Sequence, residues 1–67
     1  MDKFSKRLRE LRQEKGLSQT QLAKECGLTN GAIAFWELGQ REPKLGAVIA
    51  LAQYFGVSLD YMAGLED

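Results

Sequence analysis

The chain has 67 residues, the length of one domain, and a domain of this size has little room for a ligand cavity of about 300 Å³ or more. It contains no run of about 18 apolar residues and its first 16 residues are highly charged, so we expect neither a membrane span nor a signal peptide. Nine basic and nine acidic residues give a net charge of zero, and the single cysteine excludes an internal disulfide and fits a reducing compartment.

The charges are unevenly distributed along the chain. Residues 1–30 contain seven basic and four acidic side chains, whereas residues 31–67 contain two basic and five acidic side chains. A basic half can face phosphate groups while an acidic half faces away from them. An ordinary mixed-charge surface has the same composition, so charge alone does not select a nucleic-acid partner.

The first predicted helix covers about residues 4–15. Phe4, Leu8 and Leu11 recur at i, i+4 and i+7, which places them on one helical stripe. Gly16 follows as a left-handed C-terminal cap.

Residues 18–37 predict two short helices joined by a tight turn. Ser18 is the expected N-cap of the first, with Gln21 completing a capping box, and Gly27 ends this helix. Thr29 is the expected N-cap of the second helix, whose inward side chains are Ile33 and Trp36. Two short helices that cross at such a turn form a helix-turn-helix, which presents its second helix to the DNA major groove.

Two further helices are predicted after a loop that ends at Pro43, because proline fits just before a helix or in its first turn. The fourth helix covers about residues 44–55, and Gly56 caps it. Ser58 opens a short fifth helix, in which Leu59 and Met62 are expected to complete the core. The side chains expected to face inward from the fourth helix are Leu45, Val48, Ile49, Ala52 and Phe55.

The motif L-S-Q-x-x-L-A-x-x-x-G-L-T-x-x-x-I-x-x-W-E-x-G-x-R-x-P, followed by an apolar helix and F-G-V-S-L-D, resembles the phage repressor and Cro type of helix-turn-helix domain, the lambda repressor-like family. The resemblance extends from about Leu8 to Met62. It implies an all-α, compact five-helix domain over residues 1–67, with the helix-turn-helix unit at about residues 18–37. It also implies a cytoplasmic protein encoded by a bacterium or a phage, which binds double-stranded DNA, commonly as a homodimer, without a cofactor or a metal.

In this family the recognition helix corresponds to about residues 30–37. Asn30 can make a bidentate contact to adenine N6 and N7, although asparagine also suits the start of any helix. Gly31 offers no side chain and lowers helix stability. Ala32 and Ala34 can offer only apolar contact, for example to a thymine methyl group.

Phe35 departs most from the family pattern, which has a polar side chain at this position. Its ring is expected to pack on thymine methyl groups, to form part of an exposed patch for a protein partner, or to be buried beside Trp36. Trp36 follows Ile33 by three residues on the inward stripe, so we expect it to anchor the core and not to stack on a base.

Phosphate contacts are expected from Gln19, at the start of the second helix, and from Gln40, Arg41 and Lys44 around the following loop. For Arg41 and Lys44 the alternative is ordinary surface charge. The complete set of expected DNA-binding residues is Gln19, Thr29, Asn30, Gly31, Ala32, Ala34, Phe35, Gln40, Arg41 and Lys44.

One residue pair and the single cysteine have expected structural roles. The resemblance implies that Arg12 and Glu37 pair between the first and third helices. Cys26 is expected to be buried in the core and chemically unreactive, because a lone cysteine in a chain without histidine forms neither a zinc site nor a Cys–His nucleophile. A dimer patch is expected at Tyr61, Met62 and Leu65, with the alternative that Met62 fills the core while Tyr61 and Leu65 have no role in an interface.

The sequence therefore favours a sequence-specific DNA-binding transcriptional regulator, most simply a repressor that binds a near-palindromic operator as a dimer. The alternative is a protein-interaction or antitoxin-like module that uses an apolar surface around Phe35. An enzyme is not expected, because the chain has no histidine and no glycine-rich phosphate loop.

Overall fold

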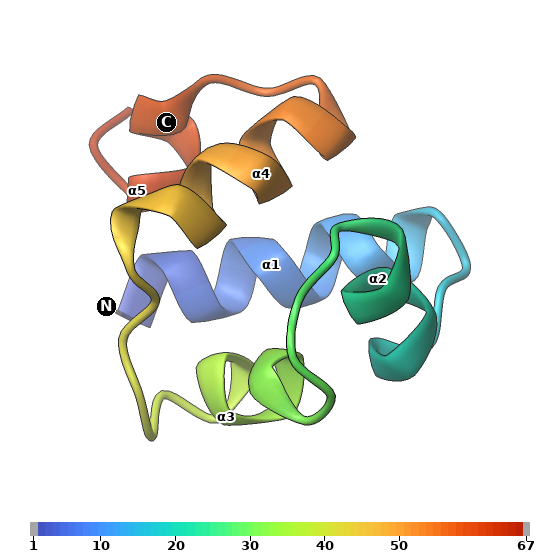
Figure 1. Cartoon of the computed structure of the whole chain (residues 1–67). Helices are drawn as coiled ribbons and strands as arrows, with labels where there is room; N and C mark the ends of the chain where they lie inside the picture. Colours follow the sequence, from blue (N-terminus) through green and yellow to red (C-terminus); the bar gives the residue numbers. More distant parts are fainter. Residues whose placement is uncertain (1, 67) are drawn as a thin grey trace.

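The computed structural model describes residues 2–66, and this part of the chain folds into five helices without strands: α1 (Asp2–Glu14), α2 (Gln19–Glu25), α3 (Ala32–Glu37), α4 (Leu45–Phe55) and α5 (Leu59–Ala63). Helix α1 crosses the middle of the molecule, with α4 above it, α3 below it and α2 near its C-terminal end (Figure 1). Helix α5 packs on both α4 and α1. The all-α, five-helix architecture predicted from the sequence is confirmed.

Local capping signals define most helix ends. The Ser18 Oγ accepts from the Gln21 N–H at 3.0 Å and the Gln21 Oε1 accepts from the Ser18 N–H at 2.8 Å, so the predicted capping box is present. The Ser58 Oγ accepts from the Tyr61 N–H at 2.9 Å and starts α5. Each helix is followed by a glycine with positive φ whose N–H bonds to a carbonyl of the last turn. These glycines are Gly16, Gly27, Gly39, Gly56 and Gly64.

The start of α3 differs from the prediction. The N-cap is Gly31, with φ of +89°, and the helix begins at Ala32, so Thr29 is not the N-cap and Asn30 precedes the helix. The Ala32 N–H bonds to the Thr29 carbonyl at 3.1 Å, which makes the intervening residues a tight turn. A left-handed residue is required within this turn, and glycine adopts that conformation without strain. Gly31 therefore permits the turn. The sequence analysis expected it to lower the stability of the helix, but it lies before the first helical residue.

The core lies between α1 and the other helices. Its buried apolar residues are Phe4, Leu8, Leu22, Ala23, Ile33, Trp36, Val48, Leu51, Ala52 and Met62. The rings of Phe4 and Trp36 meet edge to face, with centroids 6.3 Å apart. Trp36 is thus a core anchor, as predicted.

The buried face of α4 was predicted only in part. Val48 and Ala52 are buried, but Leu45 is 66% exposed and Ile49 is also exposed, whereas Leu51 is fully buried. The segment is apolar on nearly every side, so its sequence does not select the face that packs against α1 and α5. Leu59, the first residue of the short helix α5, is also exposed, although it was expected to complete the core.

Gly64 is the position where a glycine is required for two reasons at once. Its φ is +84°, and a Cβ atom there would lie 2.6 Å from the Lys3 Cβ of α1. We expect Gly64→Ala to lower the free energy of unfolding by about 2–4 kcal/mol, because left-handed strain and a steric clash add together. The matched control is Gly16→Ala, where φ is +68° and no atom lies within 4 Å, so only about 1–2 kcal/mol should be lost. Urea unfolding of both variants provides the comparison, and equal losses would contradict the close approach of α5 to α1.

Candidate nucleic-acid interface

Three helices meet at the carboxylate of Glu37, whose side chain is 3% exposed. Arg12 of α1 donates from Nε to Oε2 at 2.6 Å and from Nη2 to Oε1 at 3.0 Å. Gln19, the first residue of α2, donates from Nε2 to Oε1 at 3.1 Å. The pair that the resemblance implied between the first and third helices is present, and Gln19 extends it. This carboxylate therefore fixes α3 relative to both α1 and α2.

Arg12 remains charged in this arrangement. The hydrogen bond to Glu37 raises the pKa of the guanidinium, partial burial opposes the increase, and the negative charge of Glu37 adds to it. The same guanidinium donates from Nη1 to the Leu17 carbonyl at 2.8 Å, in the connection between α1 and α2. Arg12 thus holds two segments against α1: the connection that leads into α2, through the Leu17 carbonyl, and the C-terminal end of α3, through Glu37.

Two further side chains of α1 hold the C-terminal end of α3, and the sequence analysis missed both. The Ser5 Oγ donates to the Trp36 carbonyl, and Arg9 donates from Nη2 to the Glu37 carbonyl at 2.8 Å. These carbonyls lie in the last turn of α3, where the helical hydrogen-bond pattern runs out. Ser5, Arg9 and Arg12 lie at i, i+4 and i+7, so a polar stripe on α1 was the signal that could have identified them.

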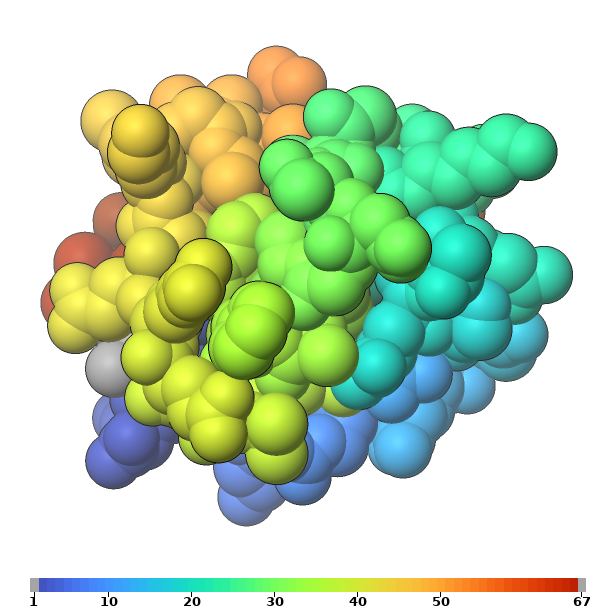
Figure 2. Space-filling model, turned by 60° about the horizontal axis from the view of Figure 1, so that its bottom comes forward, coloured from blue at the N-terminus to red at the C-terminus, as the bar shows by residue number. Residues whose placement is uncertain are grey.

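The outer side of α3 is left open by this bracing. Figure 2 shows α3 at the centre of one face, between the yellow loop that follows it and α2. An open hollow of about 460 Å³ lies beside α3, between the turn before this helix, the loop after it and the start of α4, and it is larger than the chain length had led us to expect. The predicted DNA-binding residues that line it are Thr29, Asn30, Ala32, Phe35, Arg41 and Lys44. The hollow does not include the other four, which are Gln19, Gly31, Ala34 and Gln40.

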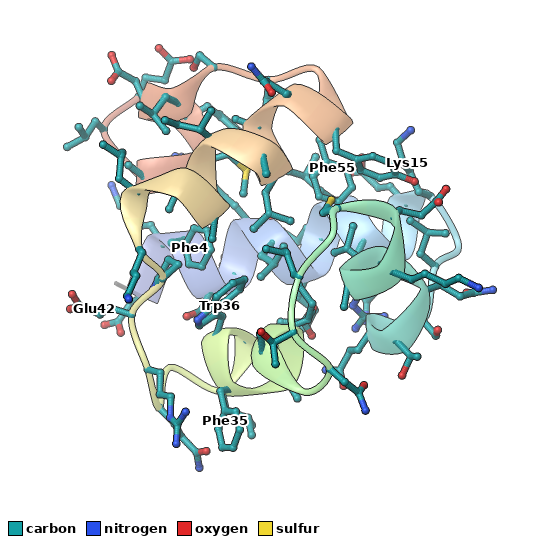
Figure 3. All side chains as sticks on the ribbon, viewed as in Figure 1. Phe4, Lys15, Phe35, Trp36, Glu42 and Phe55 are labelled. Atoms are coloured by element: carbon teal, nitrogen blue, oxygen red, sulfur yellow. The ribbon has the colours of Figure 1, made fainter. Side chains whose placement is uncertain are left out.

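Phe35 projects from α3 on this face, away from α1 (Figure 3). Its side chain is 39% exposed, so burial beside Trp36 is excluded. The Arg41 guanidinium carbon lies 4.5 Å from the centroid of the Phe35 ring. An aromatic ring and a cation from the following loop are therefore stacked on the exposed side of α3.

Residues 8–62 match the family described as helix-turn-helix. The chain belongs to this family. The helices α2 and α3 are therefore the two helices of the helix-turn-helix. The outer side of α3 is the exposed side of the second of these helices.

Similar proteins share this domain. The restriction-modification controller protein C.AhdI of Aeromonas hydrophila is 39% identical and superposes with a TM-score of 0.81 over 91% of this chain and 92% of that one. The HTH-type transcriptional regulator YqaE of Bacillus subtilis is 39% identical over 59 residues, which are 88% of this chain and 51% of that protein. The cryptic phage CTXphi transcriptional repressor RstR of Vibrio cholerae is 36% identical over 56 residues, 84% of this chain and 50% of RstR. The chain thus spans about half the length of these two curated relatives.

The expected dimer patch of this helix-turn-helix domain needs correction. Met62 is completely buried and belongs to the core, which was the stated alternative. Tyr61 is half-buried: Arg7 donates from Nη1 to its carbonyl at 2.6 Å and places its guanidinium carbon 4.2 Å from the ring centroid. Leu65 is 77% exposed and remains available for contact.

Cys26 lies at the end of the first helix of the helix-turn-helix and is half-buried against the core. Burial raises the pKa of its thiol, and the nearby charge of Glu25 adds to this shift. Both effects disfavour the reactive thiolate, in keeping with a packing role. Within residues 2–66, no helix has the length and apolar character that crossing a membrane requires.

Proposed function

We propose that this chain binds double-stranded DNA in a sequence-specific manner and regulates transcription, most simply as a repressor that occupies a near-palindromic operator as a dimer. The observation that carries the proposal is the position of α3. Its C-terminal end is hydrogen-bonded to α1 through Glu37, its outer side is exposed, and the hollow beside it is lined by polar and basic side chains, among them Asn30, Arg41 and Lys44. In the proposed complex, α3 and the turn before it enter the major groove. The role is that of a regulator and not of an enzyme, as the family and the similar proteins suggest.

Each residue of this surface has a proposed contact. Asn30 is proposed to read an adenine, and Gly31 lets the backbone of the turn approach the groove closely. Ala32, Ala34 and the Phe35 ring present apolar surface to thymine methyl groups.

The proposed phosphate contacts flank this surface on both sides. Gln19 can use its remaining amide hydrogen for a phosphate while the other is held by Glu37. Gln40 and Lys44 belong to the segment between α3 and α4, and the loop after α3 lies on the other side of α3 from α2 (Figure 2). Contacts on two sides of the recognition helix would fix its register on the duplex.

The decisive experiment is selection of duplexes from a random library by the purified chain, followed by binding of the enriched sequences across a salt series. We expect a two-fold symmetric motif with half-sites about 34 Å apart, and an affinity that falls steeply with salt. Binding that is weak and equal on all sequences would overturn the proposal. It would favour the second candidate, a protein-interaction module, for which the exposed Phe35 is the supporting observation.

Asn30→Ala tests the proposed base contact within the selected motif. We expect a loss of about 1–3 kcal/mol on duplexes that contain the read adenine and little further loss when that A·T pair is replaced. Gln40→Ala is the control, because loss of a phosphate contact should weaken binding equally on every duplex. Titration of both variants against the motif and its single-base-pair replacements separates the two results. Equal loss on all duplexes for Asn30→Ala would assign this residue to the DNA backbone.

A dimer interface is proposed on the side of the molecule formed by α4 and α5. Four of the exposed large apolar side chains belong to these two packed helices or to the residues just after them: Leu45, Ile49, Leu59 and Leu65. Clusters of exposed apolar residues on so small a domain are typical of interaction surfaces. In Figure 1, α5 and the start of α4 lie at the left, to one side of α3, so a second copy bound there would leave the outer side of α3 open.

A further inference from the structure

Arg41 is the basic side chain of the interface that is held in a defined orientation. Its guanidinium lies over the exposed ring of Phe35 at 4.5 Å. Among residues 2–66, no hydrogen bond or ion pair involves the nitrogen atoms of this guanidinium. Glu42, the next residue, lines the same hollow but does not pair with it. The donors of the guanidinium edge are therefore available while its carbon atom lies over the Phe35 ring.

Stacking on an aromatic face changes what an arginine can do. The attraction between the cation and the ring limits the rotation of a long side chain, so less entropy is lost when its hydrogen bonds form. A planar guanidinium presents two parallel N–H donors along its edge. In the major groove this geometry matches O6 and N7 of guanine, the commonest specific arginine contact to a base.

The position of the pair favours a base over a phosphate. Phe35 stands on the outer side of α3, so the guanidinium that covers it lies at the surface proposed to enter the groove, in the same hollow as Asn30. Phe35 still exposes enough of its ring to touch a neighbouring methyl group.

We propose that Arg41, whose guanidinium lies over the Phe35 ring, reads a guanine in the major groove, and that Phe35 contacts the methyl group of the adjoining thymine. This inference rests on the proposed DNA-binding function. It replaces the phosphate contact expected for Arg41. It also gives Phe35 two roles, to orient Arg41 and to contact a thymine methyl group, and these roles account for an aromatic side chain where the family pattern has a polar one.

The test uses the duplex motif selected by the unmodified chain and the set of its single-base-pair replacements. Arg41→Lys keeps the charge but loses the planar fork, and Phe35→Leu keeps an apolar side chain but loses the ring. We expect Arg41→Lys to lose about tenfold or more of the discrimination at one G·C pair, while the dependence of affinity on salt stays unchanged. Phe35→Leu should reduce discrimination at the same pair and at the T·A pair next to it. Lys44→Gln is the control and should weaken binding on all duplexes and reduce the salt slope by about 1.

The outcomes separate this inference from the function on which it rests. If the unmodified chain selects a motif but Arg41→Lys loses affinity equally on every duplex, or loses none, the guanine contact is overturned and DNA recognition stands. If Phe35→Leu changes discrimination only at positions that Arg41→Lys leaves unchanged, the coupling of the pair is overturned. If the unmodified chain selects no motif, both proposals fail together.

Discussion

Glu37→Ala is expected to lower the free energy of unfolding by about 3–5 kcal/mol, a large part of what stabilises a domain of this size. The variant leaves the Arg12 guanidinium, whose side chain is 14% exposed, without its carboxylate, and it also removes the acceptor of Gln19. A buried charge without its partner is strongly destabilising, whereas an exposed ion pair contributes at most about 1 kcal/mol. Urea unfolding followed by far-ultraviolet circular dichroism measures the loss.

Two controls define what such a loss means. Glu25→Ala removes an exposed carboxylate from α2 and should change the free energy of unfolding by about 0.5 kcal/mol or less. The double variant Arg12→Met with Glu37→Leu should recover part of the loss, because neither charge is then left unpaired. A loss below about 1 kcal/mol for Glu37→Ala would show that water screens the pair as it does at a surface.

The sequence predicted most reliably what short segments determine by themselves. Ser18 with Gln21 specifies a helix start within four residues, and the glycines after the helices specify their ends. These interactions form within one turn and need no distant partner. The same reasoning placed the N-cap of α3 at Thr29 because it gave a capping residue precedence over Gly31, although only glycine suits the left-handed conformation found there.

What the sequence left undetermined depends on residues far apart in the chain. The apolar residues of α4 surround the helix, so the buried face is chosen by packing against α1 and α5 and not by periodicity. Ser5 contacts α3 across 31 positions and Arg9 across 28, and no local motif marks such pairs. The stacking of Arg41 on Phe35 likewise depends on the path of the loop after α3, which its composition does not define.

Leu59→Asp is expected to convert a dimer into a monomer and to lower the affinity for a two-fold symmetric site by about 100-fold or more. Two linked domains bind two half-sites with an effective concentration that a single domain lacks. Leu59 is exposed and is the first residue of α5, where an acidic side chain favours the helix, so the fold should tolerate the change. The dimer, in contrast, should be strongly destabilised, because the new carboxylate would be buried without a partner in an apolar interface.

Sedimentation equilibrium and binding to duplexes with one or two half-sites measure this effect. Affinity for a single half-site should stay within about twofold, because α3 and its bracing are untouched. Leu38→Asp is the matched control: it places the same charge at an exposed leucine after α3, beside residues of α1, and should leave the dimer intact. If Leu59→Asp remains dimeric and binds the two-fold site unchanged, the interface lies elsewhere. If the unmodified chain is monomeric and binds both duplexes equally, operator recognition does not depend on a dimer of this domain.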